Sequence, residues 1–187
     1  MKIANAFQKP KTMEKPFVIL MLCSLKAYKG VNEFVSLANN LPHLNFELVL
    51  NASMDEITDF FKETNLPQNL NLYPRQSNVH PFFQKADLIV NLSHPEQWIE
   101  TFGMTLLEGM QYGLPIIAPP VGGPTEIVFS DFNGYLIDQR NETELSKKIE
   151  DISSDKKLYQ KLSHNSTQLA ERFTVEKVGE ELLELVY

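Results

Sequence analysis

Apolar residues follow two alternating patterns along this chain. Short continuous apolar runs, typical of strands buried on both faces of a sheet, alternate with segments in which apolar residues recur every three or four positions. The predicted strands cover residues 17–25, 46–50, 70–73, 87–92, 114–118 and 135–137. The predicted helices cover residues 31–41, 55–63, 79–85, 104–112 and 124–129, and a helical pattern continues from residue 142 to the end. This alternation predicts an α/β fold: a Rossmann-like parallel sheet of about six strands, flanked by helices.

The length of the chain limits the number of domains. Its 187 residues leave room for one Rossmann-sized domain but not for two. Residues 1–16 contain two prolines and no sustained periodicity, so we interpret them as a tail or linker. Residues 17–171 are predicted to form the domain, and residues 172–187 a C-terminal helix that packs on it or leaves it.

Composition and charge exclude several classes of function. The hydrophobic share of 43% and the charged share of 22% are ordinary for a globular protein with a core. The net charge of −7 argues against nucleic-acid binding, which requires a basic surface. The single cysteine, Cys23, excludes an intramolecular disulfide and a zinc site made of cysteines alone, and the four histidines lack metal-ligand spacing. We therefore expect no bound metal.

The sequence shows no signal for membrane insertion or secretion. The apolar run over residues 17–23 is far shorter than the about 20 residues of a membrane span, and residues 1–16 are polar and contain lysines. These features predict a cytoplasmic protein. Peripheral association with the inner face of a membrane stays open, because it requires only a local basic or amphipathic patch.

The loop over residues 93–105 is the richest in candidate chemistry. It follows a predicted buried strand and opens a helix, and parallel sheets bind ligands at the carboxyl ends of their strands. Gly103 has no Cβ and lets a ligand approach the backbone closely. We expect free N–H groups from Gly103 through Met104 and Thr105 to Leu106. Together with the positive end of the helix dipole, these groups would form an anion site suited to a diphosphate.

Two carboxylates, Glu100 and Glu108, bracket this predicted anion site, and each can accept hydrogen bonds from vicinal hydroxyls of a sugar or ribose. The pair Gly122-Gly123 follows another predicted strand and opens the next helix, although it also fits a simple tight turn. Lys29, in the loop after the first strand, would place a cation at the same edge of the sheet. A lysine before a glycine is also common at helix starts, so its role is open.

Four other residues near these loops are further candidates for ligand contact. Trp98 either stacks on a sugar or base or serves packing or a domain interface. Arg75 follows a predicted strand and could approach a base. All four histidines are expected in loops or on the surface, and a contact with ligand stays open for His94, which lies in the loop over residues 93–105. Glu126 either contacts ligand or simply caps its helix.

The run from Glu100 to Glu108, with Phe102-Gly103 between the two glutamates, resembles the signature of the group 1 (family four) retaining glycosyltransferases. The resemblance continues through residues 122–126 and 133–137 and covers the chain from about residue 17 to its end. It implies a GT-B fold, in which two Rossmann-like domains face each other across a cleft. This chain resembles the C-terminal, nucleotide-sugar-binding domain, preceded by a remnant of the interdomain linker. The N-terminal acceptor domain would be missing.

The resemblance also assigns roles to residues. It implies that Glu100 and Lys29 are catalytic, with Glu100 at the hydroxyls of the donor sugar and Lys29 neutralising the diphosphate without a metal. Glu108 would hold the ribose, and backbone N–H groups over residues 102–106, from Phe102 to Leu106, would bind sugar or phosphate. The Gly122-Gly123 loop would complete the donor site. The donor would be linked to UDP or GDP.

The first loop departs from the family pattern. Ser24 stands where the family commonly carries an arginine, and Lys26, two residues further on, is the candidate to replace it. The same stretch excludes a dinucleotide oxidoreductase, because the glycine-rich fingerprint of that class would have to follow the first strand.

These features together predict a donor domain for retaining transfer of a hexosyl unit to a hydroxyl acceptor, in polysaccharide or glycolipid synthesis. The alternative is a non-catalytic nucleotide-sugar-binding subunit of a split transferase. In either case we expect this chain alone to transfer no sugar.

Overall fold

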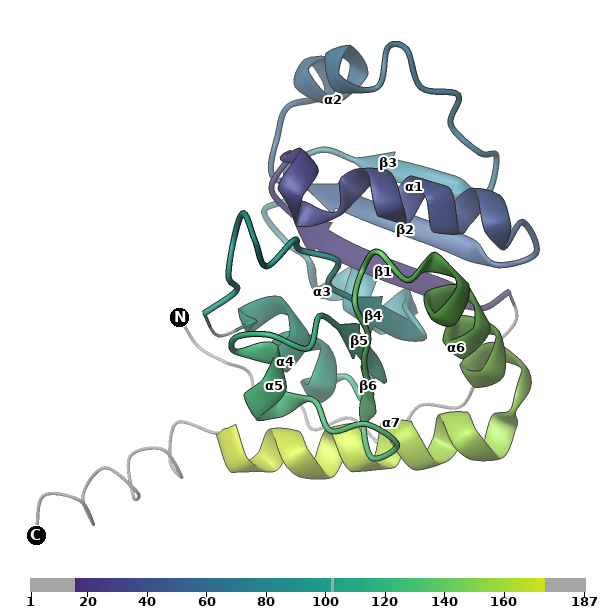
Figure 1. The fold of residues 1–187 in the computed structure, drawn as a ribbon, viewed down its shortest axis with the longest axis vertical. Coiled ribbons are helices and arrows are strands. Elements are labelled where there is room, and N and C mark those ends of the chain that lie inside the picture. Colours follow the sequence, from purple (N-terminus) through teal and green to yellow (C-terminus); the bar gives the residue numbers. More distant parts are fainter. Residues whose placement is uncertain (1–15, 102, 174–187) are drawn as a thin grey trace, which may run out of the picture.

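A computed structural model describes residues 16–101 and 103–173 of the chain. The described residues form one parallel sheet with the strand order β3-β2-β1-β4-β5-β6 (Figure 1). The strands are β1 Val18–Cys23, β2 Asn45–Leu50, β3 Leu70–Tyr73, β4 Leu88–Val90, β5 Ile116–Ala118 and β6 Gly134–Leu136. The predicted α/β sheet of about six parallel strands is therefore confirmed. Residues 1–15 of the predicted linker, Phe102 and residues 174–187 lie outside the described part.

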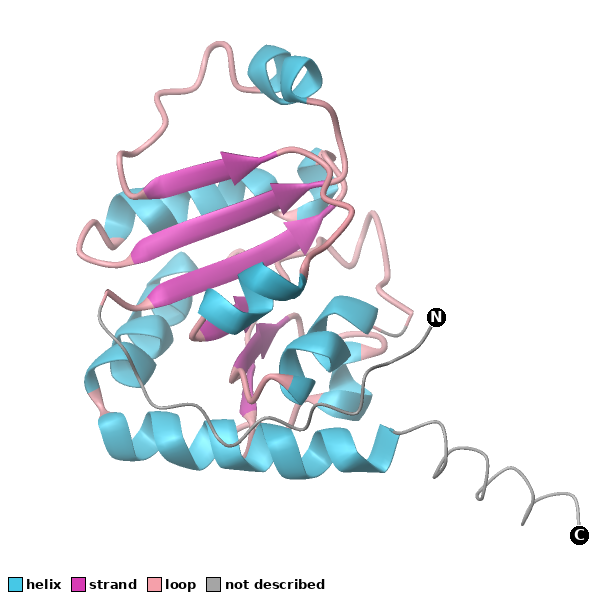
Figure 2. Ribbon diagram, turned by 180° about the vertical axis from the view of Figure 1, so that it is seen from behind, coloured by secondary structure: helices cyan, strands magenta, loops and turns pink. Residues whose placement is uncertain are grey.

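Helices cover both faces of the sheet, as the continuous apolar strands require (Figure 2). The helices are η1 Ala27–Lys29, α1 Val31–Asn40, α2 Met54–Phe60, α3 His80–Lys85, α4 Met104–Gln111, α5 Pro124–Ile127, α6 Glu142–Ser154, α7 Lys156–Ala170 and η2 Glu171–Phe173. No helix in the described ranges is both long enough and apolar enough to cross a membrane.

Strand β1 shows why two apolar clusters form. Side chains of successive strand residues point to opposite faces, so Ile19 and Met21 join the cluster under α1 and α6, while Leu20 joins the cluster under α3 and α4. All three are at most 1% exposed. A strand buried on both faces has no polar positions to spare, which explains the unbroken apolar run in the sequence.

The helical pattern after residue 142 is divided into two helices. Helix α6 ends at Ser154, and α7 begins at Lys156. Between them, Asp155 has an extended backbone, and its carboxylate accepts hydrogen bonds from the backbone N–H groups of Lys157 (2.8 Å) and Leu158 (3.1 Å). This N-cap starts α7 in a new direction, and α7 then packs along α4 and α6.

The order of the sheet reverses at β1, which pairs with β2 on one side and β4 on the other. Such a switch point leaves a crevice at the carboxyl ends of the two strands. Gly30 lets the loop after β1 lie directly against the loop after β4. Any residue with a Cβ would be too close there, because that atom would lie only 2.2 Å from the carbonyl oxygen of Leu92. The φ of Gly30, 78°, is also one that glycine adopts without strain. The two loops therefore meet directly at the crevice.

Candidate functional site

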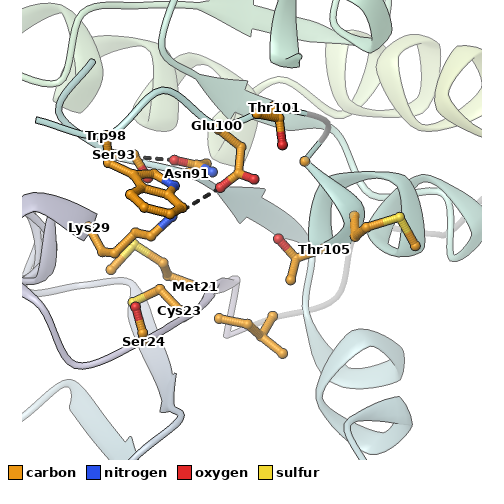
Figure 3. Close-up of a pocket in the computed structure, with 13 residues that line it drawn as sticks. Met21, Cys23, Ser24, Lys29, Asn91, Ser93, Trp98, Glu100, Thr101 and Thr105 are labelled. Atoms are coloured by element: carbon orange, nitrogen blue, oxygen red, sulfur yellow. Dashed lines mark hydrogen bonds and ion pairs between the residues drawn. The ribbon is translucent and has the colours of Figure 1, made fainter. Parts of the chain in front are cut away.

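A cavity of about 400 Å³ lies at this switch point (Figure 3). Two segments far apart in the sequence form it: the end of β1 with the loop that follows it, and the loop after β4 with the first turn of α4, into which that loop leads. The lining residues are Met21, Leu22, Cys23, Ser24, Lys29, Asn91, Ser93, Trp98, Glu100, Thr101, Gly103, Met104 and Thr105. Its position follows from strand order, so the sequence-predicted loops after β1 and β4 share one cavity.

The cavity brings together Lys29 and Glu100, the two residues for which the family resemblance implies a catalytic role. Lys29 ends η1, Glu100 lies in the loop after β4, and the lysine Nζ donates to the glutamate Oε2 at 3.1 Å. The two side chains are 14% and 25% exposed, so water screens this ion pair less than a surface pair. The pair places a cation and a carboxylate side by side in the cavity wall, where each can also contact a ligand.

The first turn of α4 borders the same cavity through Gly103, Met104 and Thr105. Gly103 is the N-cap with a φ of 77°, and no side chain caps the helix. The first amides of a helix lack acceptors within it, and they carry the positive end of its dipole. The prediction for Leu106 is wrong: its N–H donates to the carbonyl of Gly103 at 2.9 Å, and its side chain is buried. The first turn closes one residue earlier than expected.

Glu108 lies one turn further along α4, outside the residues that line the cavity. It is partly buried, and burial raises the pKa of its carboxyl, while the nearby His80 opposes that rise. His80 in turn contacts the hydroxyl of Tyr112, with 2.5 Å between Nδ1 and the phenol oxygen. The two signature glutamates therefore occupy different environments: Glu100 is paired with a lysine, and Glu108 is held in a partly desolvated position.

A second cavity of about 290 Å³ adjoins the first and shares Leu22, Cys23, Ser24 and Thr105 with it. It extends toward Arg75, whose Nε donates to Asn51 Oδ1 at 2.6 Å. A ligand longer than the first cavity has room to continue here. Arg75 lines this second cavity, and its contact with a base stays a prediction.

Gly122 and Gly123 line neither cavity; they support the loop that carries Glu100. The N–H of Gly123 donates to the carbonyl of Glu100 at 2.7 Å. A Cβ on Gly122 would lie 2.5 Å from that same carbonyl oxygen, and the φ of Gly122 is 74°. The pair thus fixes the backbone of Glu100, a contact that the sequence alone did not indicate.

The two residues of the first loop have different positions. Ser24 borders both cavities, where the family arginine would stand. Lys26 is exposed and lines neither. Two hydrogen bonds from Ser53 lower the pKa of Glu56, and the charge of Lys26 makes a smaller contribution in the same direction. Lys26 therefore lies near Glu56, outside both cavities, and does not take the place of the family arginine there.

The remaining candidates for chemistry near the cavity are His94, Glu126 and Cys23. His94 Nε2 lies 2.8 Å from Glu33 Oε1 on α1, and Glu126 is exposed on α5. Burial raises the pKa of the Cys23 thiol to about 12, with Lys29 opposing, so this cysteine is a poor nucleophile at neutral pH. No group of three or more His, Cys, Asp or Glu side chains placed to hold a metal occurs in the described ranges.

The fold and this cavity define a class of protein: an α/β domain with a Rossmann-like parallel sheet and a cavity at its switch point. Residues 2–169 match the family "Glycosyl transferases group 1", and the chain belongs to this family. It is 31% identical over 152 residues to the uncharacterized glycosyltransferase MJ1178 of Methanocaldococcus jannaschii, covering 81% of this chain and 35% of that protein. It is 26% identical to the poly(glycerol-phosphate) alpha-glucosyltransferase of Bacillus subtilis, covering 88% and 24%.

Solved structures show the same fold. Anabaena HepE in complex with UDP has a TM-score of 0.79 at 22% identity, covering 91% of this chain and 48% of that one. The C-terminal domain of the group 1 protein LpcC from Francisella tularensis has a TM-score of 0.70 at 23% identity, covering 84% and 85%. This chain therefore spans between 24% and 47% of the length of its first three curated relatives, and about half of HepE.

Proposed function

We propose that this chain is the donor-binding domain of a retaining, family-four glycosyltransferase, and that it binds a nucleoside diphosphate sugar. The observation that carries the proposal is the cavity at the switch point, where Lys29, Glu100 and the first turn of α4 converge. Cation and helix dipole suit a diphosphate, and the carboxylate suits sugar hydroxyls. The complexes of HepE with UDP and with UDP-glucose support UDP as the first nucleotide to test.

The arrangement supplies what the departure of a diphosphate requires. When the bond between the anomeric carbon and the diphosphate oxygen breaks, negative charge collects on the leaving phosphate. Lys29 and the amides at the start of α4 would stabilise that charge, which is the usual way in which fixed dipoles and cations lower such a barrier. Glu100 would accept from donor hydroxyls, and Glu108 from the ribose. The hydroxyl of the acceptor, and any base that takes its proton, would belong to the other half of the cleft.

Because the lysine and the helix dipole neutralise the leaving group, we propose that donor binding needs no metal. We also propose that the chain alone transfers no sugar, because one domain cannot enclose the acceptor or exclude water from it. Hexosyl transfer with retained configuration is a proposal for the protein with both domains.

Isothermal titration of the full chain with UDP, GDP, ADP and UDP-glucose tests the proposal. We expect one nucleoside diphosphate to bind with a stoichiometry of one, with the same affinity in the presence of a chelator. Lys29→Ala should weaken that binding more at low salt than at high salt, because salt screens the lost attraction. Failure of every nucleotide to bind, or an unchanged affinity in Lys29→Ala, would contradict it.

A further inference from the structure

Trp98 is the large aromatic side chain in the wall of the cavity, and its indole lies beside Lys29 (Figure 3). The Nζ of Lys29 is 4.9 Å from the centroid of the indole ring. The ring also stacks on Tyr28, with 6.0 Å between centroids and 20° between planes. A cation within about 6 Å of an indole face is attracted by the ring, and tryptophan is the strongest of the aromatic partners.

Lys29 is thus held by two groups of different kinds. Glu100 attracts the ammonium with a full charge at 3.1 Å, whereas Trp98 attracts it through a neutral ring. A diphosphate that enters the cavity brings its own negative charge and competes with the carboxylate for Lys29. The indole carries no charge, so it does not compete and can stay in contact while the ammonium changes its anionic partner.

The backbone around Trp98 is fixed to the segment that carries Lys29. The N–H of Trp98 donates to the carbonyl of His94 at 2.9 Å, and the N–H of His94 donates to the carbonyl of Tyr28 at 2.8 Å. The side chain of His94 reaches Glu33 on α1. The indole therefore has a defined position relative to the lysine before any ligand arrives.

We propose that Trp98 is a positioning residue, which holds the Lys29 ammonium at the diphosphate position through a cation–π contact. This inference rests on the proposed function, in which the diphosphate binds at Lys29. A role in the core does not account for the contact, because Trp98 is 48% exposed. A lysine side chain has many rotamers, so restricting them before binding favours affinity.

The test compares Trp98→Phe and Trp98→Leu with wild type by titration with UDP. We expect Trp98→Leu to weaken UDP binding by about five-fold and Trp98→Phe by less, because phenylalanine keeps a weaker π face. In a Lys29→Met background, the same Trp98→Leu change should alter affinity by less than about two-fold, because the cation on which the indole acts is gone.

Lys148→Met is a matched control. Lys148 lies over the ring of Tyr135 at 4.4 Å, and neither residue lines the cavity. Removing this second lysine–aromatic contact should leave UDP affinity unchanged, while the equivalent change at Lys29 should not. Thermal denaturation of each variant confirms that it is folded.

Fluorescence separates this inference from the proposed function, because Trp98 is the only tryptophan of the chain. We expect Lys29→Met to change its emission without any nucleotide, and Lys148→Met to leave it unchanged. Unchanged emission in Lys29→Met would contradict the contact itself. Equal weakening by Trp98→Leu with and without Lys29 would mean that the indole touches the ligand directly, and no weakening would mean that it has no positioning role. If wild type binds none of UDP, GDP and ADP, the proposed function fails, whatever the emission shows.

Discussion

Replacing Glu100 by glutamine is expected to tighten the binding of UDP, although Glu100 is assigned to the donor site. In the structure its carboxylate occupies Lys29, with 3.1 Å between Nζ and Oε2, and a diphosphate must take the lysine from it. Exposed ion pairs contribute about 0.2–1 kcal/mol. Since these side chains are only 14% and 25% exposed, we take the upper end of that range for the Lys29–Glu100 pair. A diphosphate that no longer has to break a pair of about 1 kcal/mol binds roughly five-fold more tightly.

UDP-glucose should respond differently from UDP. Its sugar would lose a charged acceptor when Glu100 becomes glutamine, and a hydrogen bond to a charged group contributes about 1.5–3 kcal/mol. That loss offsets the gain at Lys29. The ratio of UDP-glucose affinity to UDP affinity should therefore fall, and the two ligands together distinguish competition for the lysine from damage to the site.

Titration calorimetry of both ligands at low and high salt measures these affinities. Glu150→Gln is a suitable control, because Glu150 is exposed on α6, lines no part of the cavity and makes the same change in net charge. Weaker UDP binding by a folded Glu100→Gln variant, or equally tighter binding by Glu150→Gln, would refute competition between Glu100 and the diphosphate for Lys29. The first result would make the ion pair a requirement for the site, and the second would make the effect one of overall charge.

Three further predictions concern other parts of the site. Glu108→Gln should weaken UDP binding by about 1–3 kcal/mol. Because burial raises the pKa of Glu108, wild-type affinity should fall as pH drops through that raised pKa, a dependence that a titration series in Glu108→Gln should lack. Ser24→Arg should tighten UDP binding by about 1 kcal/mol in calorimetry, since a guanidinium binds phosphate in a forked geometry. Gly122→Ala should lower the free energy of unfolding by at least about 1 kcal/mol, as measured by thermal denaturation, because the φ of Gly122 is 74° and a Cβ there would meet the Glu100 carbonyl.

Much of the fold follows from patterns in the sequence, because the strands β1, β4 and β5 are largely buried and read as continuous apolar runs. The break between α6 and α7 was not predicted, since the apolar spacing continues across it and only the side chain of Asp155 starts the second helix. Likewise, nothing local in the sequence shows that the Gly103 carbonyl uses the amide of Leu106.

The site was predictable as a set of loops but not as a set of contacts. Lys29 and Glu100 are 71 positions apart, and their pairing depends on β1 and β4 being neighbours in the sheet. Apolar periodicity does not indicate the order of the strands in the sheet. The rule that ligands bind at the carboxyl ends of parallel strands nevertheless places the loops after β1 and β4 at the same edge of the sheet. Trp98 could be noted beside Glu100 in the sequence, but its contact with Lys29 requires the same strand order.

The most direct test of the central claim is a crystal structure of this chain with UDP bound. We predict that the diphosphate lies in the switch-point cavity, with phosphate oxygens about 2.7–3.2 Å from Lys29 Nζ and from an amide of Gly103, Met104 or Thr105. We also predict that the 3.1 Å contact between Lys29 and Glu100 is broken. A diphosphate bound elsewhere on the domain, or one bound in this cavity beside an intact Lys29–Glu100 pair, would contradict the account.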